Sequence, residues 1–337
     1  MKCLLVGLLW GVSAWSLMAR PVMDRPNVVL IYLDDSGFGD FSFNGNPVIE
    51  TPHLDGLARE GVNFTQFYVT SPACSASRYS LLTGRYPARS GFGTWVLGPG
   101  AGPHLREEEV TLAEGLKARG YATGMFGKWH LGNPNPGNGM SVAALPLAHG
   151  FDSWVGTNVS HDYGNAKLLR SDPSGRAPVA GYAEMARDLP SDIEASTSLT
   201  GLYTDAAVAF IKEHKDRPFF AYVAHNQPHL GLFASKAYQG KSRRGLLGDV
   251  MAEIDASVGR ILTALEEAGV ARHTLLIFSS DNGPWVRFRN VAKSKYGEAR
   301  THVGYALPFR DGKGSCWEGG HRTPGIFHWP GTIAPKR

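Results

Sequence analysis

The most informative ten residues of the chain read Pro26-Asn27-Val28-Val29-Leu30-Ile31-Tyr32-Leu33-Asp34-Asp35. The run Asn27–Leu33 is continuously apolar and rich in β-branched residues, which is typical of a strand buried on both faces of a sheet. Two carboxylates follow this strand directly. Because ligands of α/β proteins gather at the carboxyl ends of parallel strands, the stretch predicts a buried strand with a functional site at its end.

Further strands and helices alternate along the chain. Buried-strand patterns recur at Phe219–Ala224 and Thr274–Ser279, and Phe64–Val69 is also strand-like. Capping signals and apolar spacing predict helices after Thr51-Pro52, between Thr111 and Gly120, over Tyr203–His214 and over Val250–Ala268. This alternation predicts an α/β fold of parallel βαβ units with helices on both faces of the sheet.

Two stretches lack such patterns. Pro134–Leu147 is rich in Pro, Gly and Asn, and Ser171–Leu199 mixes Ser, Asp, Pro and Gly. Both are predicted as long surface loops, which in α/β enzymes often surround the active site.

Composition excludes several classes of protein. The 337 residues are 43% hydrophobic and 19% charged, with a net charge of +4. These values exclude a coiled coil, a collagen, a disordered chain and a multi-span membrane protein, and the charge is too small to indicate a nucleic-acid partner. The length predicts two domains or one large one.

The amino terminus has the pattern of a targeting segment. Lys2 precedes an apolar run, Cys3–Val12, and small residues follow at Ala14 and Ala19. This pattern predicts a secretory signal peptide over residues 1–19, and the apolar run is shorter than the roughly 20 residues of a spanning helix. We therefore expect a secreted, periplasmic or lysosomal protein, without stable membrane insertion, whose catalytic domain covers residues 24–337.

Few cysteines remain after such a cleavage. Only Cys74 and Cys316 are left, too few for a disulfide-built scaffold. They are predicted to form one disulfide or to be two buried thiols, unless one of them carries chemistry.

Two acidic pairs follow predicted strands. Asp34-Asp35 ends the first strand, and Asp281-Asn282-Gly283 follows the strand that ends near Ser279. If the strand ends meet, four oxygen-donor side chains would suit a hard cation such as Ca²⁺ or Mg²⁺. Taken singly, either motif is also explained as a helix cap or a turn.

The surroundings of Cys74 favour chemistry. A short helix is predicted to follow it, with Gly84 as terminator. A thiol at a helix N-terminus is favoured as the thiolate, and Arg78, one turn further on, would reach an anion held there. The alternative is a buried core cysteine on a strand-to-helix turn.

The run Cys74-Ser75-Ala76-Ser77-Arg78 with Leu82-Thr83-Gly84-Arg85 resembles the signature of the type I, formylglycine-dependent sulfatases. Gly127-Lys128-Trp129-His130-Leu131-Gly132 is similar to the second signature of that family, and the Asp-rich motifs above agree in order. The resemblance covers Arg25 to Pro335. Through Ser160-His161-Asp162 it is closest to the arylsulfatase A and N-acetylgalactosamine-6-sulfatase branches. It implies a mostly parallel, mixed sheet sandwiched by helices, the alkaline-phosphatase-like sulfatase fold.

The resemblance also implies roles for individual residues. Cys74 would be oxidised to formylglycine by a formylglycine-generating enzyme, and its hydrate would attack the sulfur of a sulfated small molecule or glycan. Ca²⁺, with Mg²⁺ less favoured, would be held by Asp34, Asp35, Cys74, Asp281 and Asn282. Arg78, Lys128 and Lys313 would supply positive charge to the sulfuryl oxygens. His229 would donate a proton to the leaving alcohol, and His130 would help the diol break down. Substrate contact would involve Ser160, Lys128, His229 and Lys313.

The sequence departs from the family pattern at two points. Ala76 stands where the maturation signal usually has proline, and the chain ends at Arg337, so we expect the smaller C-terminal antiparallel subdomain to be largely missing. His225 is either a site residue or a hydrogen-bonded core histidine. Two alternative functions stay open, a phosphate or phosphonate monoester hydrolase and a non-catalytic glycan-binding relative.

Overall fold

One mixed sheet runs through the computed structural model, which describes residues 25–93, 96–98, 104–132, 142–164, 166–172, 174, 181–286 and 303–336. Its strands are β1 Asn27–Leu33, β2 Val62–Asn63, β3 Ala122–Gly127, β4 Ser153–Thr157, β5 Lys167–Ser171, β6 Tyr182–Arg187, β7 Phe219–Ala224, β8 Thr274–Ser280 and β9 Gly325–His328. Within the described residues the sheet has nine strands, in the order β2-β9-β8-β1-β7-β3-β4-β5-β6.

The centre of the sheet is parallel and its margins are antiparallel. The strands β8, β1, β7, β3 and β4 all run in one direction. The strands β5, β6 and β9 pair antiparallel with their neighbours. This arrangement confirms the predicted α/β class and the mostly parallel, mixed sheet.

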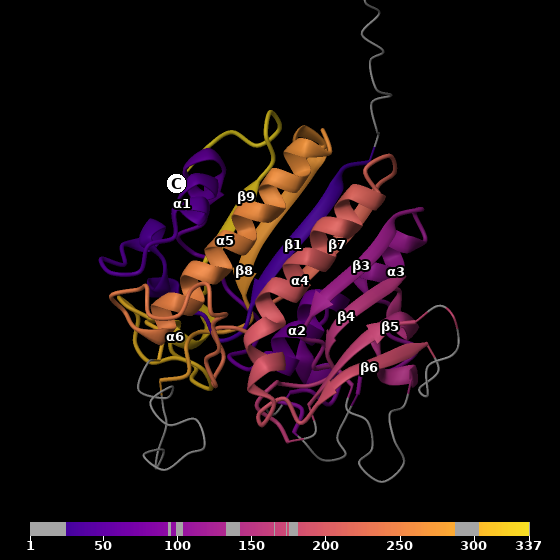
Figure 1. The fold of residues 1–337 in the computed structure, drawn as a ribbon, viewed down its shortest axis with the longest axis horizontal. Coiled ribbons are helices and arrows are strands. Elements are labelled where there is room, and N and C mark those ends of the chain that lie inside the picture. Colours follow the sequence, from indigo (N-terminus) through magenta and orange to yellow (C-terminus); the bar gives the residue numbers. More distant parts are fainter. Residues whose placement is uncertain are drawn as a thin grey trace, which may run out of the picture.

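Helices cover both faces of the sheet. They are α1 Pro52–Glu60, α2 Cys74–Thr83, α3 Leu112–Lys117, α4 Ile193–Glu213, α5 Leu246–Glu267 and α6 Glu318–His321. In Figure 1, α4 and α5 lie in front of the sheet, while α2 and α3 lie behind it.

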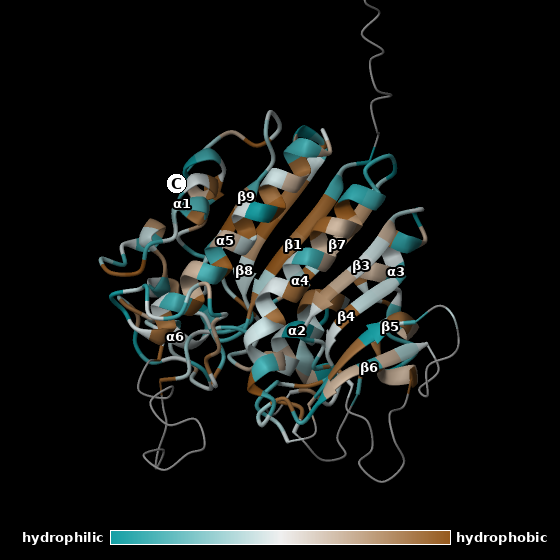
Figure 2. Cartoon of the chain, in the orientation of Figure 1, coloured by the Kyte–Doolittle hydropathy of each residue, from teal (hydrophilic) through white to brown (hydrophobic). Residues whose placement is uncertain are grey.

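Side chains of β1 point alternately to the two faces of the sheet and contribute to a hydrophobic core on each. Val29, Ile31 and Leu33 pack into a cluster with residues of α1, α4 and α5. Leu30 and Tyr32 point to the other face, into a cluster with residues of α2 and α3. Because successive side chains of a strand point to opposite faces, a strand buried on both sides is apolar along most of its length, as Figure 2 shows for β1.

Local signals set the helix ends. Thr111 and Glu114 form the predicted capping box at the start of α3. Gly84 ends α2 in the left-handed conformation, with φ of 68°. Thr51 precedes α1 with Pro52 as first helical residue, but its side chain does not cap the helix.

Some predicted elements are wrong. Phe64–Val69 is not a strand, because its backbone bonds irregularly to the segment around α6 and β9. Ser171–Leu199 is not one loop, since it holds β6 and the first turns of α4, whose N-terminus Asp192 caps through the amide of Ala195. Most of Pro134–Leu147 and the predicted signal peptide lie outside the described residues. None of the described helices combines the length and apolar character that crossing a bilayer requires.

Candidate active site

The carboxyl ends of the five parallel strands converge on one group of polar residues. Beyond β1 lie Asp34 and Asp35, and beyond β8 lie Asp281 and Asn282. The other three strands lead to Lys128 and His130 after β3, Ser160 after β4, and His229 after β7. All of these side chains are buried. The structure therefore brings together residues from far-separated parts of the chain at the edge where parallel sheets bind ligands.

A glycine lets the chain turn inward after β3. Gly127 has φ of +126°, and a Cβ atom there would lie 1.8 Å from the carbonyl oxygen of Ala224. The next residue, Lys128, donates its backbone N–H to the same carbonyl oxygen at 2.7 Å. Only glycine fits this close approach, which directs Lys128 and His130 toward the strand ends.

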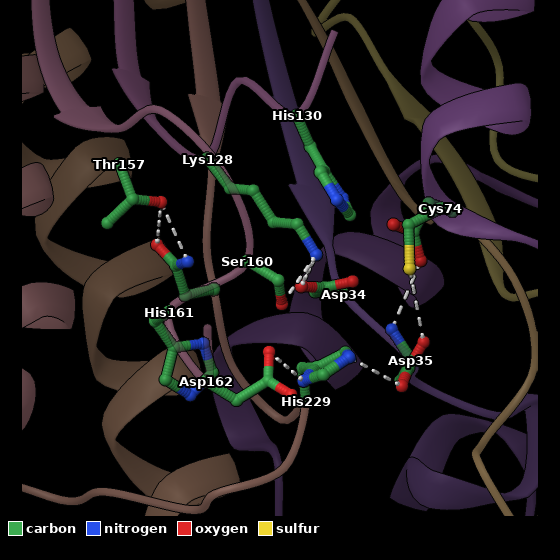
Figure 3. A network of polar contacts seen from close by, with 12 residues as sticks. Asp34, Asp35, Cys74, Lys128, His130, Thr157, Ser160, His161, Asp162 and His229 are labelled. Carbon is green, nitrogen blue, oxygen red and sulfur yellow. Dashed lines mark hydrogen bonds and ion pairs between the residues drawn. The ribbon is translucent and has the colours of Figure 1, made fainter. Parts of the chain in front are cut away.

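Cys74 lies at the start of α2, inside this group. Its Sγ atom is 3.0 Å from Lys313 Nζ and 3.7 Å from Asp35 Oδ1. Figure 3 shows Cys74 directed toward Asp35. The predicted helix after Cys74 is confirmed, but the predicted thiolate is wrong. Burial raises the pKa of Cys74 well above its ordinary value, although the charges of Lys128 and Lys313 act to lower it. The predicted disulfide is also wrong, because both thiols are free and Cys316 is exposed.

Buried ion pairs surround Cys74. Lys128 Nζ lies 2.5 Å from Asp34 Oδ2, and Arg78 Nη2 lies 2.8 Å from Asp281 Oδ2 and 3.7 Å from Asp34 Oδ1. Lys313 Nζ is 2.9 Å from Asp35 Oδ1. Buried charges of this kind are tolerated only when paired. Three carboxylates and three cations leave no net formal charge, 3 − 3 = 0, so one added divalent cation would make the site positive.

The acidic residues fit a hard cation. One ligand atom from each of Asp34, Asp35, Cys74 and His229 lies within 4.8 Å of the others. Among the described atoms, the buried oxygens Asp34 Oδ1 and Asn282 Oδ1 have no hydrogen-bond partner. Burial, followed by the Asp34 carboxylate, raises the pKa of Asp281 to about 7. A divalent cation would use the orphaned oxygens and relieve this repulsion.

Asp34 shows the opposite shift. Burial alone would raise the pKa of Asp34, but Lys128, followed by His229 and Arg78, holds it well below its ordinary value. Burial likewise opposes the charge on Lys313, yet the carboxylate of Asp35 raises the pKa of Lys313 well above its ordinary value. Asp34 is therefore an anion and Lys313 a cation at neutral pH.

His130 presents a free base to the site. Its Nε2 lies 2.9 Å from the carbonyl oxygen of Leu97, and a carbonyl only accepts, so Nε2 carries the hydrogen. Burial, followed by the charge of Lys128, lowers the pKa of His130 well below its ordinary value, so the ring is neutral. Its Nδ1 is buried and has no hydrogen-bond partner among the described residues. The ring can therefore accept a proton at Nδ1.

His229 has its Nε2 atom, not its Nδ1 atom, turned toward Asp35. Its Nδ1 lies 2.5 Å from the carbonyl oxygen of Leu230, so Nδ1 carries a hydrogen. Its Nε2 lies 3.5 Å from Asp35 Oδ2. In Figure 3, the ring lies between Asp35 and Asp162. A proton on Nε2 would be available to a bound substrate.

Of two further predicted residues, Ser160 lies in the site and His225 lies in the core. Ser160 joins the site, since its Oγ accepts a hydrogen bond from Lys128 Nζ at 3.2 Å. His225 is a core histidine: it is buried, lies 3.2 Å from Ser257 Oγ, and burial lowers its pKa to about 4.

Three residues near the site were not assigned from the sequence. Asp162 Oδ1 lies 3.9 Å from His229 Nδ1, and the ring of Tyr163 packs against His130. The ring of Trp285 packs against His229. Asp162 belongs to the motif Ser160-His161-Asp162 described above. Tyr163 follows that motif directly, and Trp285 lies two residues after Asp281-Asn282-Gly283, so neither belongs to a motif.

Known proteins resemble this chain along nearly its whole length. The sequence profile of the family described as Sulfatase matches residues 26–337. Arylsulfatase A of Homo sapiens is 40% identical over 339 residues, which cover 97% of this chain and 63% of that protein. N-acetylgalactosamine-6-sulfatase of Mus musculus is 38% identical over 349 residues, which cover 97% and 62%. The chain thus spans less than two thirds of the length of these relatives.

A solved structure agrees with the sequence comparisons. The PsFucS1 sulfatase from Pseudoalteromonas sp. superposes with a TM-score of 0.77 at 30% identity, over 92% of this chain and 63% of that one. The likeness confirms the predicted sulfatase fold over the described residues.

Proposed function

The chain belongs to the sulfatase family, and we propose that it hydrolyses aryl or carbohydrate sulfate esters with a formylglycine nucleophile made from Cys74. The maturation would be catalysed by a formylglycine-generating enzyme, which uses an external oxidant to replace the thiol of Cys74 by an aldehyde oxygen. Residues 24–337 form the catalytic domain in this proposal. The sequence of residues 1–19 supports export to a secreted, periplasmic or lysosomal location.

One observation carries the proposal. The neutral, buried thiol of Cys74 lies 3.0 Å from the ammonium of Lys313, among the buried ion pairs of Arg78 with Asp281, Lys128 with Asp34 and Lys313 with Asp35. A core cysteine has no need of such surroundings, because a neutral thiol packs best among apolar groups. An anionic substrate and a nucleophile at position 74 account for the arrangement.

The first half of the reaction uses the cations and His229. One hydroxyl of the hydrated aldehyde gives its proton to the carboxylate of Asp35, whose Oδ1 lies 3.7 Å from Sγ of Cys74. Its oxygen attacks sulfur, and the bond between sulfur and the ester oxygen breaks. Arg78, Lys128 and Lys313 balance the charge on the sulfuryl oxygens. His229 Nε2 passes its proton to the departing ester oxygen, so that the alcohol leaves neutral.

The second half uses His130. Its Nδ1, which has no hydrogen-bond partner among the described residues, takes the proton from the remaining hydroxyl at Cβ of residue 74. The aldehyde re-forms as the bond between Cβ and the sulfate oxygen breaks, and sulfate leaves. Water then restores the diol. Two moderate steps replace one difficult step, as in other covalent mechanisms.

A bound calcium ion would support the first step. Asp34, Asp35, Asp281 and Asn282 would hold it, together with an oxygen of the modified residue 74. When bound, the ion supplies positive charge that lowers the pKa of the attacking hydroxyl and polarises the sulfate.

The test compares two esters. The matured protein is incubated with 4-nitrophenyl sulfate and with 4-nitrophenyl phosphate at equal concentration, with Cys74→Ala as the control. We expect faster release of nitrophenol from the sulfate and none with the variant. Faster turnover of the phosphate would instead support a phosphate ester hydrolase, and binding without turnover would support a non-catalytic relative.

A further inference from the structure

The ring of Trp285 lies against two residues of the proposed catalytic site. Its centroid is 5.6 Å from that of the His229 ring, at an interplanar angle of 52°. Lys313 Nζ lies over the same ring, 4.6 Å from its centroid. The backbone fixes this position, because the amide of Lys313 donates to the carbonyl oxygen of Pro284 at 2.9 Å. Trp285 is thus held where the proton donor and a sulfate-binding cation meet.

Tyr163 has a matching place beside the other histidine. Its ring contacts that of His130 edge to face, with centroids 5.7 Å apart and an angle of 75°. Its backbone is held in a turn, in which its amide donates to the carbonyl oxygen of Ser160 at 3.1 Å. Both Tyr163 and Trp285 also pack against the larger hydrophobic core. Because both rings are already held by the core, ligand binding does not have to fix their conformation.

These two rings differ from the rest of the site in their exposure. The charged residues around Cys74 are buried, whereas Tyr163 and Trp285 are partly exposed. A sulfate group would occupy the buried, charged part, so the atoms attached to its ester oxygen must lie toward solvent. His229 gives its proton to that oxygen in the proposed mechanism, and therefore the first atoms of the leaving group lie beside Trp285.

We propose that Trp285 and Tyr163 form the walls of a leaving-group subsite that selects sulfate esters of ring-shaped alcohols, aryl or pyranose, over those of linear chains. Flat aromatic faces give a ring more contact than they give a flexible chain, which loses conformational freedom when it binds. The inference rests on the proposed function, because it uses the assignment of His229 as proton donor.

A purely supporting role makes a different prediction. If Trp285 only held Lys313 and His229 in place, its loss would weaken every sulfate-like ligand to the same degree. A specificity wall instead affects ligands that carry a ring. The preference between two ligands with the same anionic head therefore separates the two roles.

The experiment measures binding of two non-hydrolysable sulfonates, in which a CH₂ group replaces the ester oxygen. Phenylmethanesulfonate carries a ring, and heptane-1-sulfonate has the same number of carbons in a chain. Their dissociation constants are measured by calorimetry with the matured, calcium-loaded protein and its variants. We expect the wild type to bind the ring compound about tenfold more tightly, a typical effect of a well-placed aromatic contact.

The variants decide between the roles. Trp285→Ala should remove most of the ring preference while changing the affinity for heptane-1-sulfonate by less than about threefold. Trp285→Phe should keep most of the preference, and Tyr163→Leu should reduce it. Trp329→Ala is the matched control, because Trp329 is a half-buried tryptophan beyond the end of β9, bonded to the carbonyl oxygen of Arg272.

Two results would overturn the inference: equal weakening of both sulfonates by Trp285→Ala, or a wild type without ring preference. Neither result would touch the proposed function, whose failure would appear as the absence of sulfate-ester turnover by the wild type.

Discussion

Replacing His130 by alanine should separate the two halves of the proposed reaction. We assign the breakdown of the diol ester to the buried Nδ1 atom of His130, to which no group in the described part of the chain is hydrogen-bonded. Loss of a general base costs roughly 10²–10⁴-fold in rate. At about 1.4 kcal/mol for each tenfold, the barrier of the second step should rise by about 3–5 kcal/mol. The first step uses His229 and should stay fast.

The assay is rapid-mixing kinetics with 4-nitrophenyl sulfate. His130→Ala should release about one nitrophenol per active site in a burst, followed by slow turnover, as a stalled covalent intermediate requires. Mass spectrometry should then find a sulfate group on residue 74. His225→Phe is the matched control, since it changes a buried histidine outside the site. Steady turnover by His130→Ala near the wild-type rate, or a slow first turnover without a burst, would refute the assignment.

Three other perturbations test the ion pairs, the cation and the core. Lys128→Met leaves Asp34 without its 2.5 Å partner, so chemical denaturation should show a loss of about 3 kcal/mol in unfolding free energy; an unchanged value would contradict the pairing. Asp281→Ala should abolish most of the rise in melting temperature that calcium gives the wild type, and undiminished calcium affinity would remove Asp281 from the ligand set. For His225, whose folded pKa is lowered to about 4, the unfolded state takes up a proton first as the pH falls below about 6.5. Stability from the neutral ring is therefore lost between pH 6.5 and pH 4, by roughly 3 kcal/mol. His225→Phe should flatten that part of the pH–stability profile, and an identical acid loss in the variant would show that other groups cause it.

The sequence predicted best the strands that are buried on both faces. β1, β7 and β8 are continuous apolar runs, and their ends agree with the structure to within one residue. β3 lacks such a pattern because close packing requires small residues there. A Cβ on Gly124 would lie 2.8 Å from Phe126 and 2.9 Å from Phe210. Tertiary contacts that no local pattern encodes therefore decide this strand.

The candidate site was predicted in its composition more than in its electrostatics. The acidic pairs, Lys128 and His130 could be found because motifs mark them, and the strand ends bring them together. The protonation state of Cys74 could not, because the local helix end favours a thiolate while burial by distant segments raises the pKa. Trp285 was missed since its contacts with His229 and Lys313 join three separate parts of the chain.

In the proposed reaction residue 74 becomes the nucleophile, and the mass of one peptide shows whether Cys74 is converted. The protein is produced with an active formylglycine-generating enzyme, and the tryptic peptide Glu60–Arg78 is weighed. We predict a mass in which one oxygen has replaced the sulfur and two hydrogens of Cys74, or the hydrate of that aldehyde. A peptide that carries only intact cysteine, although the same enzyme converts a control substrate, would contradict the account.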